Sequence, residues 1–203
     1  MGNTDQEKSG TPKKSKITRL DVFWVILVVF LLIPSVRKEL STYFIRFTLS
    51  KAKIKSVIIP ESLSPADLQW EFTDSVSHNY TLKDFRGQRI FLNFWATWCA
   101  PCRAEMPSIQ ELYYKSKDST VFIMACFEPR DAINSYITKE GLKIPIYYCR
   151  QKPTGNLLFQ SFPTTFVISK EGRIIYKHSS AANYNSEEII ELLNGSKNKQ
   201  NGK

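Results

Sequence analysis

The chain is predicted to be an α/β protein whose central sheet is packed on both faces. Between about residue 66 and residue 194, apolar strand-like runs alternate with helix-like segments, and turn residues such as Lys170-Glu171-Gly172 separate them. This alternation is typical of a sheet with other elements packed against it. The full chain has 203 residues, which is enough for one domain of ordinary size with appendages.

The first half of this region is predicted to form a hairpin, a buried strand and a long helix. Leu68–Phe72 and Asn79–Leu82 are the arms of the hairpin. Arg89–Trp95 is almost continuously apolar and is therefore predicted to be a buried strand. A helix is predicted over Pro101–Lys117, because proline suits a first turn, where its missing N–H is not needed.

The second half is predicted to add four strands and two helices. The strands are Val121–Phe127, Ile144–Tyr148, Pro163–Ser169 and Arg173–Lys177. One helix covers Asp131–Glu140 and ends at Gly141. The last helix begins at Asn185 or Ser186 and ends at Gly195.

The positive charge of the chain is concentrated near its N-terminus. Residues 1–59 hold 11 Lys/Arg and 4 Asp/Glu, whereas residues 60–203 hold 17 and 15. No basic stripe interleaved with aromatic residues occurs in the predicted domain, which argues against a nucleic-acid partner. A basic leader fits a membrane surface better.

Residues 20–36 are predicted to be a short, uncleaved membrane anchor that follows a disordered basic segment over residues 1–19. The uncharged run from Val22 to Val36 would reach roughly 22 Å as a helix, short of the roughly 30 Å of a hydrocarbon core. Length alone therefore also allows a cleavable signal peptide. The sequence has no Ala-x-Ala-like site after Ile33, however, and Arg19 and Arg37 can reach the headgroups.

Residues 37–65 are predicted to be an amphipathic segment followed by a linker from Lys51 to Pro65. Apolar residues recur there at helical spacing between basic ones, which indicates a helix lying on the membrane or, alternatively, a core helix. The apolar positions are Val36, Leu40, Tyr43, Phe44 and Phe47. Residues 66–194 form the predicted domain and residues 195–203 a disordered tail. Basic residues flank the anchor on both sides, so loop charge does not give its orientation.

The most informative motif is Trp98-Cys99-Ala100-Pro101-Cys102-Arg103, which follows the predicted buried strand. Cys99 would lie at a helix N-terminus, where unpaired N–H groups and the macrodipole favour a thiolate. Cys102 falls one turn later on the same face and can close a disulfide or attack a mixed disulfide. The pair is therefore predicted to carry out two-electron thiol exchange.

Other uses of these cysteines find less support. A structural zinc site needs a second ligand pair, and Cys126 and Cys149 lie singly in separate apolar runs. Haem attachment needs His where this chain has Arg103. Cys126 is interpreted as a small buried hydrophobe, and pairing of Cys126 with Cys149 stays open.

The stretch from Asn93 to Pro107, together with Phe162-Pro163-Thr164-Thr165-Phe166, resembles the membrane-anchored, thioredoxin-like thiol-disulfide oxidoreductases of the TlpA/ResA type. The resemblance covers roughly residues 66–194. It implies a thioredoxin fold with an N-terminal hairpin and an inserted strand and helix within Ile144–Gln160. It also implies a single-pass protein of the bacterial cytoplasmic membrane whose redox domain faces outward and reduces clients such as apocytochrome c.

In that family Cys99 matches the attacking thiol and Cys102 the resolving thiol. Pro163 matches a proline that follows a cis bond beside the dithiol, and the backbone of Phe162 would pair with substrate. Trp98 and Pro101 complete the expected substrate-binding surface. Trp95 is either part of an apolar rim or a core residue.

One departure from thioredoxin itself bears on proton transfer. Asn93 stands where thioredoxin keeps a buried aspartate, and an amide cannot take a proton from the resolving thiol. Glu105 matches an acidic residue of ResA-like members and is the expected proton shuttle, with a solvated surface charge as the alternative. Glu128 is a weaker candidate.

The expected function is thus reduction of client disulfides by Cys99 and Cys102, with no cofactor or metal beyond this redox-active disulfide. Its expected partners are client proteins, a membrane electron donor and the bilayer. A disulfide oxidase or isomerase, a thiol peroxidase and a non-enzymatic binding module stay open as alternatives, because a fold does not decide the direction of exchange.

Overall fold

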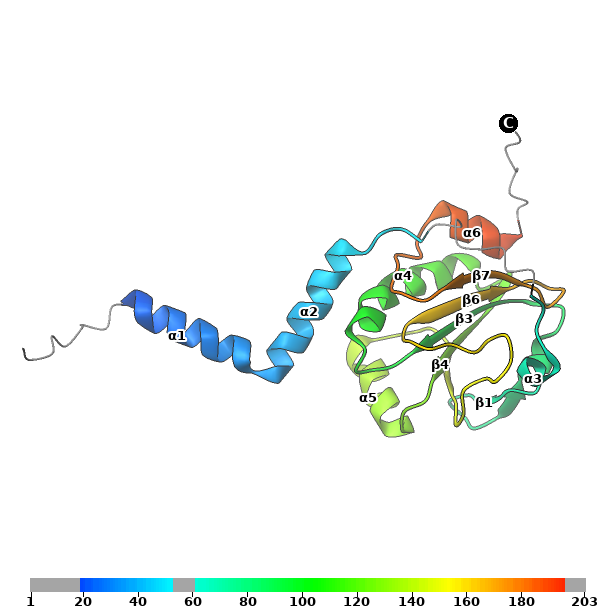
Figure 1. Ribbon diagram of the computed structural model, residues 1–203, viewed down its shortest axis with the longest axis horizontal. Helices are drawn as coiled ribbons and strands as arrows, with labels where there is room; N and C mark the ends of the chain where they lie inside the picture. The colour runs from blue at the N-terminus through cyan, green and yellow to red at the C-terminus, as the bar shows by residue number, and fades with distance from the viewer. Residues whose placement is uncertain (1–18, 53–60, 196–203) are drawn as a thin grey trace, which may run out of the picture. The chain divides into compact units, whose positions relative to one another are not determined.

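Figure 1 shows the computed structural model of the chain, which describes residues 19–52 and 61–195. The chain divides into two units, residues 1–39 and residues 40–203. The segments at residues 1–18, 53–60 and 196–203, where most of the predicted disorder and part of the predicted linker fall, lie outside the described residues.

A mixed sheet of seven strands forms the centre of the second unit, with the order β2-β1-β5-β4-β3-β6-β7. Figure 1 labels its neighbouring strands β4, β3, β6 and β7. The strands are β1 (Glu71–Thr73), β2 (Asn79–Thr81), β3 (Arg89–Trp95), β4 (Thr120–Cys126), β5 (Ile146–Tyr148), β6 (Thr164–Ile168) and β7 (Ile174–His178). The central strand β3 runs parallel to β4 and antiparallel to β6. Its mostly apolar sequence fits this position, since every residue after Arg89 is buried.

Three helices, α4 (Ala100–Ser116), α5 (Arg130–Glu140) and α6 (Glu187–Asn194), cover one face of this sheet. The 3-10 helix η1 (Leu82–Phe85), the short helix α3 (Pro65–Leu68) and irregular segments lie on the other side. Residues of α4, α5 and α6 share one hydrophobic cluster with Phe91 and Trp95. The opposite cluster joins Phe94 to the β1–β2 hairpin and to the segment between β5 and β6. This division follows from the alternation of side chains along β3.

Helices α5 and α6 end at the glycines that the sequence predicts. Gly141 and Gly195 follow α5 and α6 in the left-handed region, with φ of 64° and 80°. Ser186, not Asn185, is the N-cap of α6, since its side chain accepts a hydrogen bond from the backbone of Ile189.

Two expectations need correction. The inserted helix within Ile144–Gln160 is wrong: in the described chain, residues 149–163 form neither helix nor strand between β5 and β6. Pro153 and Gly155 lie in this segment and oppose helix formation there. Leu68 belongs to α3, so the hairpin begins later than predicted, at Glu71.

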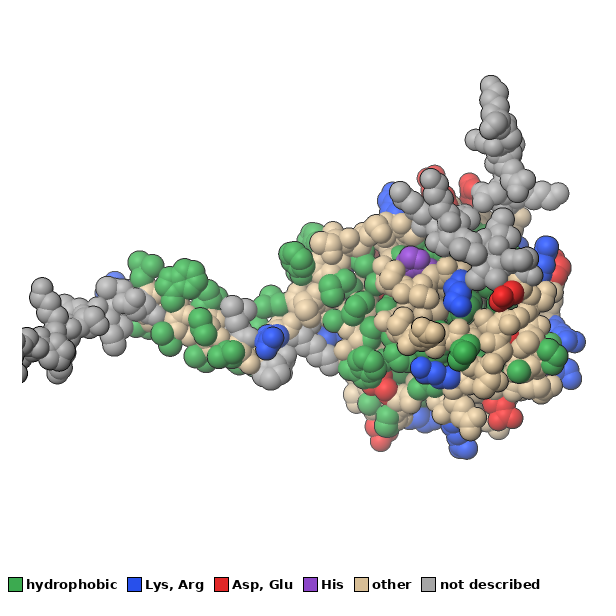
Figure 2. Space-filling model, viewed as in Figure 1, with side chains coloured by type: hydrophobic (Ala, Val, Ile, Leu, Met, Phe, Trp, Pro, Cys, Tyr) green, Lys and Arg blue, Asp and Glu red, His purple; other side chains and the backbone are tan. Residues whose placement is uncertain are grey.

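The N-terminal region is helical, with α1 at Arg19–Leu32 and α2 at Pro34–Thr48. Apolar side chains lie at the surface of α1, as Figure 2 shows. Phe23 and Ile26 are among the exposed ones. Helix α2 contains the predicted amphipathic stripe, of which Tyr43, Phe44 and Phe47 are exposed. Within the described ranges, none of the helices combines the length and apolarity needed to cross a bilayer. The predicted anchor at residues 20–36 therefore stays a prediction.

Candidate functional site

The two cysteines of the motif form a disulfide at the beginning of α4. Cys99 is the N-cap residue, and the backbone N–H of Cys102 points at its sulfur, with the nitrogen 3.2 Å from Sγ. Pro101 lies in the first turn, as its missing N–H allows. When the disulfide is reduced, the same N–H and the helix dipole would stabilise a thiolate on Cys99.

The two sulfur positions differ in access. Cys99 is 5% exposed and Cys102 is 0% exposed, so any exchange partner meets Cys99 first. Both belong to the hydrophobic cluster on the helical face of the sheet, together with fully buried Trp95. Trp95 is therefore a core residue, which was one of its two predicted roles.

The turn between β3 and α4 is held by Glu128. The backbone N–H and the hydroxyl of Thr97 donate hydrogen bonds to its carboxylate at 2.6 and 2.7 Å. The thiol of Cys126 donates to the same carboxylate at 3.4 Å. The contacts of Glu128, the weaker acidic candidate of the sequence analysis, thus place it beside the turn that leads to Cys99.

An aromatic surface lies beside the disulfide. The Phe162–Pro163 bond is cis, as the sequence resemblance implies. The ring of Phe162 meets Trp98 edge to face at 5.8 Å and packs on Phe159 at 5.3 Å. Trp98 is 59% exposed, so an apolar surface next to Cys99 is open to a partner.

Glu105, which follows Cys102 by three residues on α4, lies in the interior and not at the surface. It is fully buried, and its carboxylate accepts hydrogen bonds from the side-chain amide of Asn93 at 2.9 Å and from the backbone N–H of Ala182 at 3.2 Å. Burial raises the pKa of Glu105 from 4.5 to about 8, and the two hydrogen bonds lower it only in part.

Further buried polar groups extend this network. The hydroxyl of Thr165 accepts hydrogen bonds from Asn93 at 2.9 Å and from the Tyr184 hydroxyl at 2.8 Å. Burial and the charge of Glu105 raise the pKa of Tyr184. Sequence reasoning missed Thr165, Ala182 and Tyr184, because the strand register and the chain path that bring them to Glu105 leave no local signal.

Comparisons with known proteins agree with this geometry. Residues 62–191 match the model of the Redoxin family. The chain belongs to the Redoxin family.

Curated relatives narrow this assignment to proteins named ResA. The chain is 39% identical over 105 residues to "Thiol-disulfide oxidoreductase ResA" of Geobacillus kaustophilus, a match that covers 50% of this chain and 60% of that relative. It is 31% identical over 124 residues to the protein of the same name from Halalkalibacterium halodurans, covering 59% and 70%. This confirms the predicted ResA-like assignment, although the chain spans only about 60% of the length of the first relative.

A solved structure supports the thioredoxin-like fold. It is described as a putative protein disulfide isomerase from Bacteroides thetaiotaomicron and is 26% identical, with a TM-score of 0.53. The match covers 68% of this chain and 87% of that one.

The remaining cysteines of this Redoxin-family chain, Cys126 and Cys149, are buried and free. Their strand ends are adjacent, since the N–H of Cys149 donates to the carbonyl of Cys126 at 2.8 Å. Cys126 nevertheless belongs to the cluster on the helical face and Cys149 to the cluster on the other face. Because the sheet backbone separates the two side chains, a disulfide between them is disfavoured.

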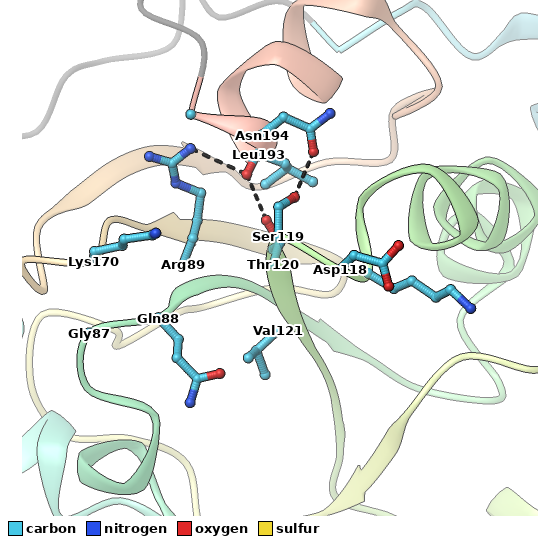
Figure 3. A pocket seen from close by; sticks show the side chains of 12 residues that line it. Gly87, Gln88, Arg89, Asp118, Ser119, Thr120, Val121, Lys170, Leu193 and Asn194 are labelled. Atoms are coloured by element: carbon cyan, nitrogen blue, oxygen red, sulfur yellow. Dashed lines mark hydrogen bonds between the residues drawn. The ribbon is translucent and has the colours of Figure 1, made fainter.

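A hollow of about 660 Å³ lies where β3 and β4 begin, at the ends of these strands away from the disulfide (Figure 3). Arg89 and Thr120, the first residues of β3 and β4, donate hydrogen bonds there to the carbonyl oxygen of Leu193 at 3.2 and 2.8 Å. These contacts satisfy carbonyl groups at the end of α6. The hollow is thus part of the packing of α6, remote from the disulfide.

Proposed function

We propose that this chain is a membrane-tethered thiol-disulfide oxidoreductase outside the cytoplasm, which reduces disulfides of client proteins through Cys99 and Cys102. The observation that carries the proposal is the disulfide itself. It joins an N-cap cysteine to a fully buried one beside a cis-proline segment and an open aromatic surface. Relatives named thiol-disulfide oxidoreductase support it.

The reaction consists of two exchanges. In the reduced chain, the Cys99 thiolate attacks one sulfur of a client disulfide and forms a mixed disulfide, while the other client sulfur leaves as a thiolate. The Cys102 thiolate then attacks Cys99 Sγ and releases the second client thiolate. Two electrons pass to the client, which ends as a dithiol, and the chain ends as the Cys99–Cys102 disulfide.

Glu105 is the proposed proton acceptor for Cys102. A carboxyl group with a pKa of about 8 is well matched to an ordinary thiol, so a proton can pass in either direction at little cost. Asn93 can support both states. Its amide nitrogen donates to the ionised carboxylate, and its Oδ1, which has no partner within the described residues, would accept from the neutral acid after the amide rotates.

Trp98, Phe162 and Pro163, with Pro101 in the first turn of α4, are the proposed client-binding residues. The exposed ring of Trp98 and the neighbouring ring of Phe162 offer apolar contact area next to Cys99. Binding through rings and backbone is tolerant of client sequence, which suits a protein that acts on unfolded polypeptides.

The proposed location is the outer side of the bacterial cytoplasmic membrane, with residues 20–36 as the anchor. The exposed apolar side chains of α1 and the basic residues on either side support a membrane contact. Apocytochrome c is the proposed client, and a membrane donor of electrons would restore the dithiol. The bilayer is the third proposed partner.

Transfer of electrons to a peptide disulfide tests this function. The reduced full-length chain should convert one equivalent of a disulfide-bonded peptide to its dithiol, and a Cys99→Ser variant should not. The reduction potential decides the direction, since a value near −270 mV or lower, as in thioredoxin, favours a reductant and a value near −120 mV favours an oxidant. A chain that transfers no electrons would instead indicate a binding module with a structural disulfide.

A further inference from the structure

The aromatic surface beside the disulfide is carried by a segment that has no regular structure of its own. Residues 149–163 connect β5 to β6 and include Phe159 and Phe162. Few backbone hydrogen bonds join residues within the segment; one of them runs from the N–H of Leu158 to the carbonyl oxygen of Gly155 at 3.1 Å. Contacts from elsewhere in the chain must therefore keep this segment in place.

Two of these contacts come from Asp67, a carboxylate that is 0% exposed. It accepts hydrogen bonds from the backbone N–H groups of Asn156 at 2.9 Å and Leu157 at 3.1 Å. It also accepts from the backbone N–H and the hydroxyl of Ser64 at 2.8 and 2.7 Å. One buried carboxylate thus ties α3 to the middle of the segment.

The fit around this carboxylate is close. A Cβ atom on Gly155 would lie 2.1 Å from the Ser64 hydroxyl and 2.5 Å from an oxygen of Asp67. Glycine is therefore required at position 155 for the segment to reach Asp67.

A short chain of contacts connects this point to the disulfide. Leu157 is fully buried, and two residues later Phe159 stacks on Phe94 of β3 with ring centroids 4.2 Å apart. Phe159 contacts Phe162, which in turn contacts Trp98 next to Cys99. Movement of residues 155–157 would displace Phe162, whereas Trp98 and the cysteines, at the beginning of α4, would keep their positions.

We propose that Asp67 is a positioning residue for client binding, which acts by holding residues 155–157 so that Phe162 stays beside Trp98. This rests on the proposed function, since it concerns the surface that receives the client. The positioning role of Asp67 predicts different effects on two reactions of the site. Reaction of the disulfide with a small thiol needs only access to sulfur, whereas reaction with a polypeptide also needs the aromatic surface.

The chain provides a matched control. Thr81 and Asp84 repeat the Ser64–Asp67 arrangement, with the N–H and the hydroxyl of Thr81 donating to Asp84 at 2.7 and 2.9 Å. Asp84 is exposed, and among the described residues its hydrogen bonds hold only its own local cap. Asp67→Asn and Asp84→Asn therefore make the same chemical change in the same motif, but only the first disturbs the segment.

The experiment uses the full-length chain in detergent, with dithiothreitol as reductant and a disulfide-bonded octapeptide as substrate. Asp67→Asn should raise KM for the peptide about tenfold, equivalent to about 1.4 kcal/mol. The rate at which dithiothreitol reduces the Cys99–Cys102 disulfide should stay within about twofold of wild type. Gly155→Ala should reproduce both results, and the double variant should be no worse than either single one, because both act on one contact. Asp84→Asn should match wild type.

An unchanged KM in Asp67→Asn would overturn the positioning role, as would a parallel fall in the dithiothreitol rate. Failure of both Asp67→Asn and Gly155→Ala to fold would overturn it as well, since Asp67 would then serve the fold and not the site. A wild-type chain that cannot reduce the peptide would contradict the proposed function itself.

Discussion

Replacement of Glu105 by glutamine is expected to remove a large part of the pH dependence of stability. The variant keeps the size of the side chain and an oxygen that can accept from Asn93, but it cannot titrate. In wild type, burial favours the neutral acid, so the folded chain binds this proton more tightly than the unfolded chain does. The stabilisation is fully present below the unfolded pKa of 4.5 and is lost as the pH rises through about 8.

The size of the effect follows from the pKa of Glu105. The pKa of Glu105 is 4.5 in the unfolded chain and about 8 in the folded chain. Titration of this group therefore lowers the free energy of unfolding of wild type by about 4 kcal/mol as the pH rises from 5 to 9. Glu105→Gln should not show this fall. The free energy of unfolding of the variant minus that of wild type should therefore be larger at pH 9 than at pH 5.

Urea unfolding of the oxidised full-length chain at both pH values measures this difference, since Cys99 and Cys102 do not titrate while they form a disulfide. Glu111→Gln, on the exposed side of the same helix, controls for the loss of a carboxylate. Tyr184 depends on the charge of Glu105, but its pKa is raised above the usual 10.0, so it stays protonated between pH 5 and pH 9. The remaining groups contribute equally to wild type and variant and cancel in the comparison. If Glu105→Gln and wild type lost the same free energy between pH 5 and pH 9, Glu105 would not carry a raised pKa.

Three further results are expected. Alkylation of the reduced chain at mildly acidic pH should label Cys99 before Cys102, because only Cys99 lies at the N-terminus of α4 and is partly accessible; the opposite order would reverse their roles. Protease added to spheroplasts should digest the redox domain, whereas its protection, or a mature N-terminus after Val36, would contradict an outward-facing anchored protein. Non-reducing peptide mapping of the oxidised chain should find Cys126 and Cys149 unpaired, since they lie on opposite faces of the sheet; a peptide that joins them would refute this.

Much of the domain could be predicted because its signals are local. The bounds predicted for the central strand, Arg89–Trp95, are those of β3, since seven residues with almost no polar side chain fit only a buried strand. The ends of α5 and α6 were predictable because Gly141 and Gly195 adopt the left-handed conformation that ends a helix, which is a property of the glycine itself. The segment after β5 was harder, because its conformation depends on Asp67, which lies far away in sequence.

The site was predictable where it depends on one helix. Cys99 and Cys102 follow from their spacing, and the burial of Glu105 was also open to prediction. Glu105 lies three residues after Cys102 and four before Ile109, so it shares the apolar face of α4. Its partners could not be predicted, because the pairing of Asn93 with Thr165 joins residues 72 positions apart.

Trapping of a mixed disulfide tests the central claim most directly. In a Cys102→Ser variant the second exchange cannot occur, so incubation with a disulfide-bonded client peptide should leave the peptide covalently attached to Cys99, as mass spectrometry would show. The adduct should disappear on addition of dithiothreitol, and the Cys99→Ser variant should form none. An adduct on Cys102 in the Cys99→Ser variant, with none on Cys99 in the Cys102→Ser variant, would contradict the account.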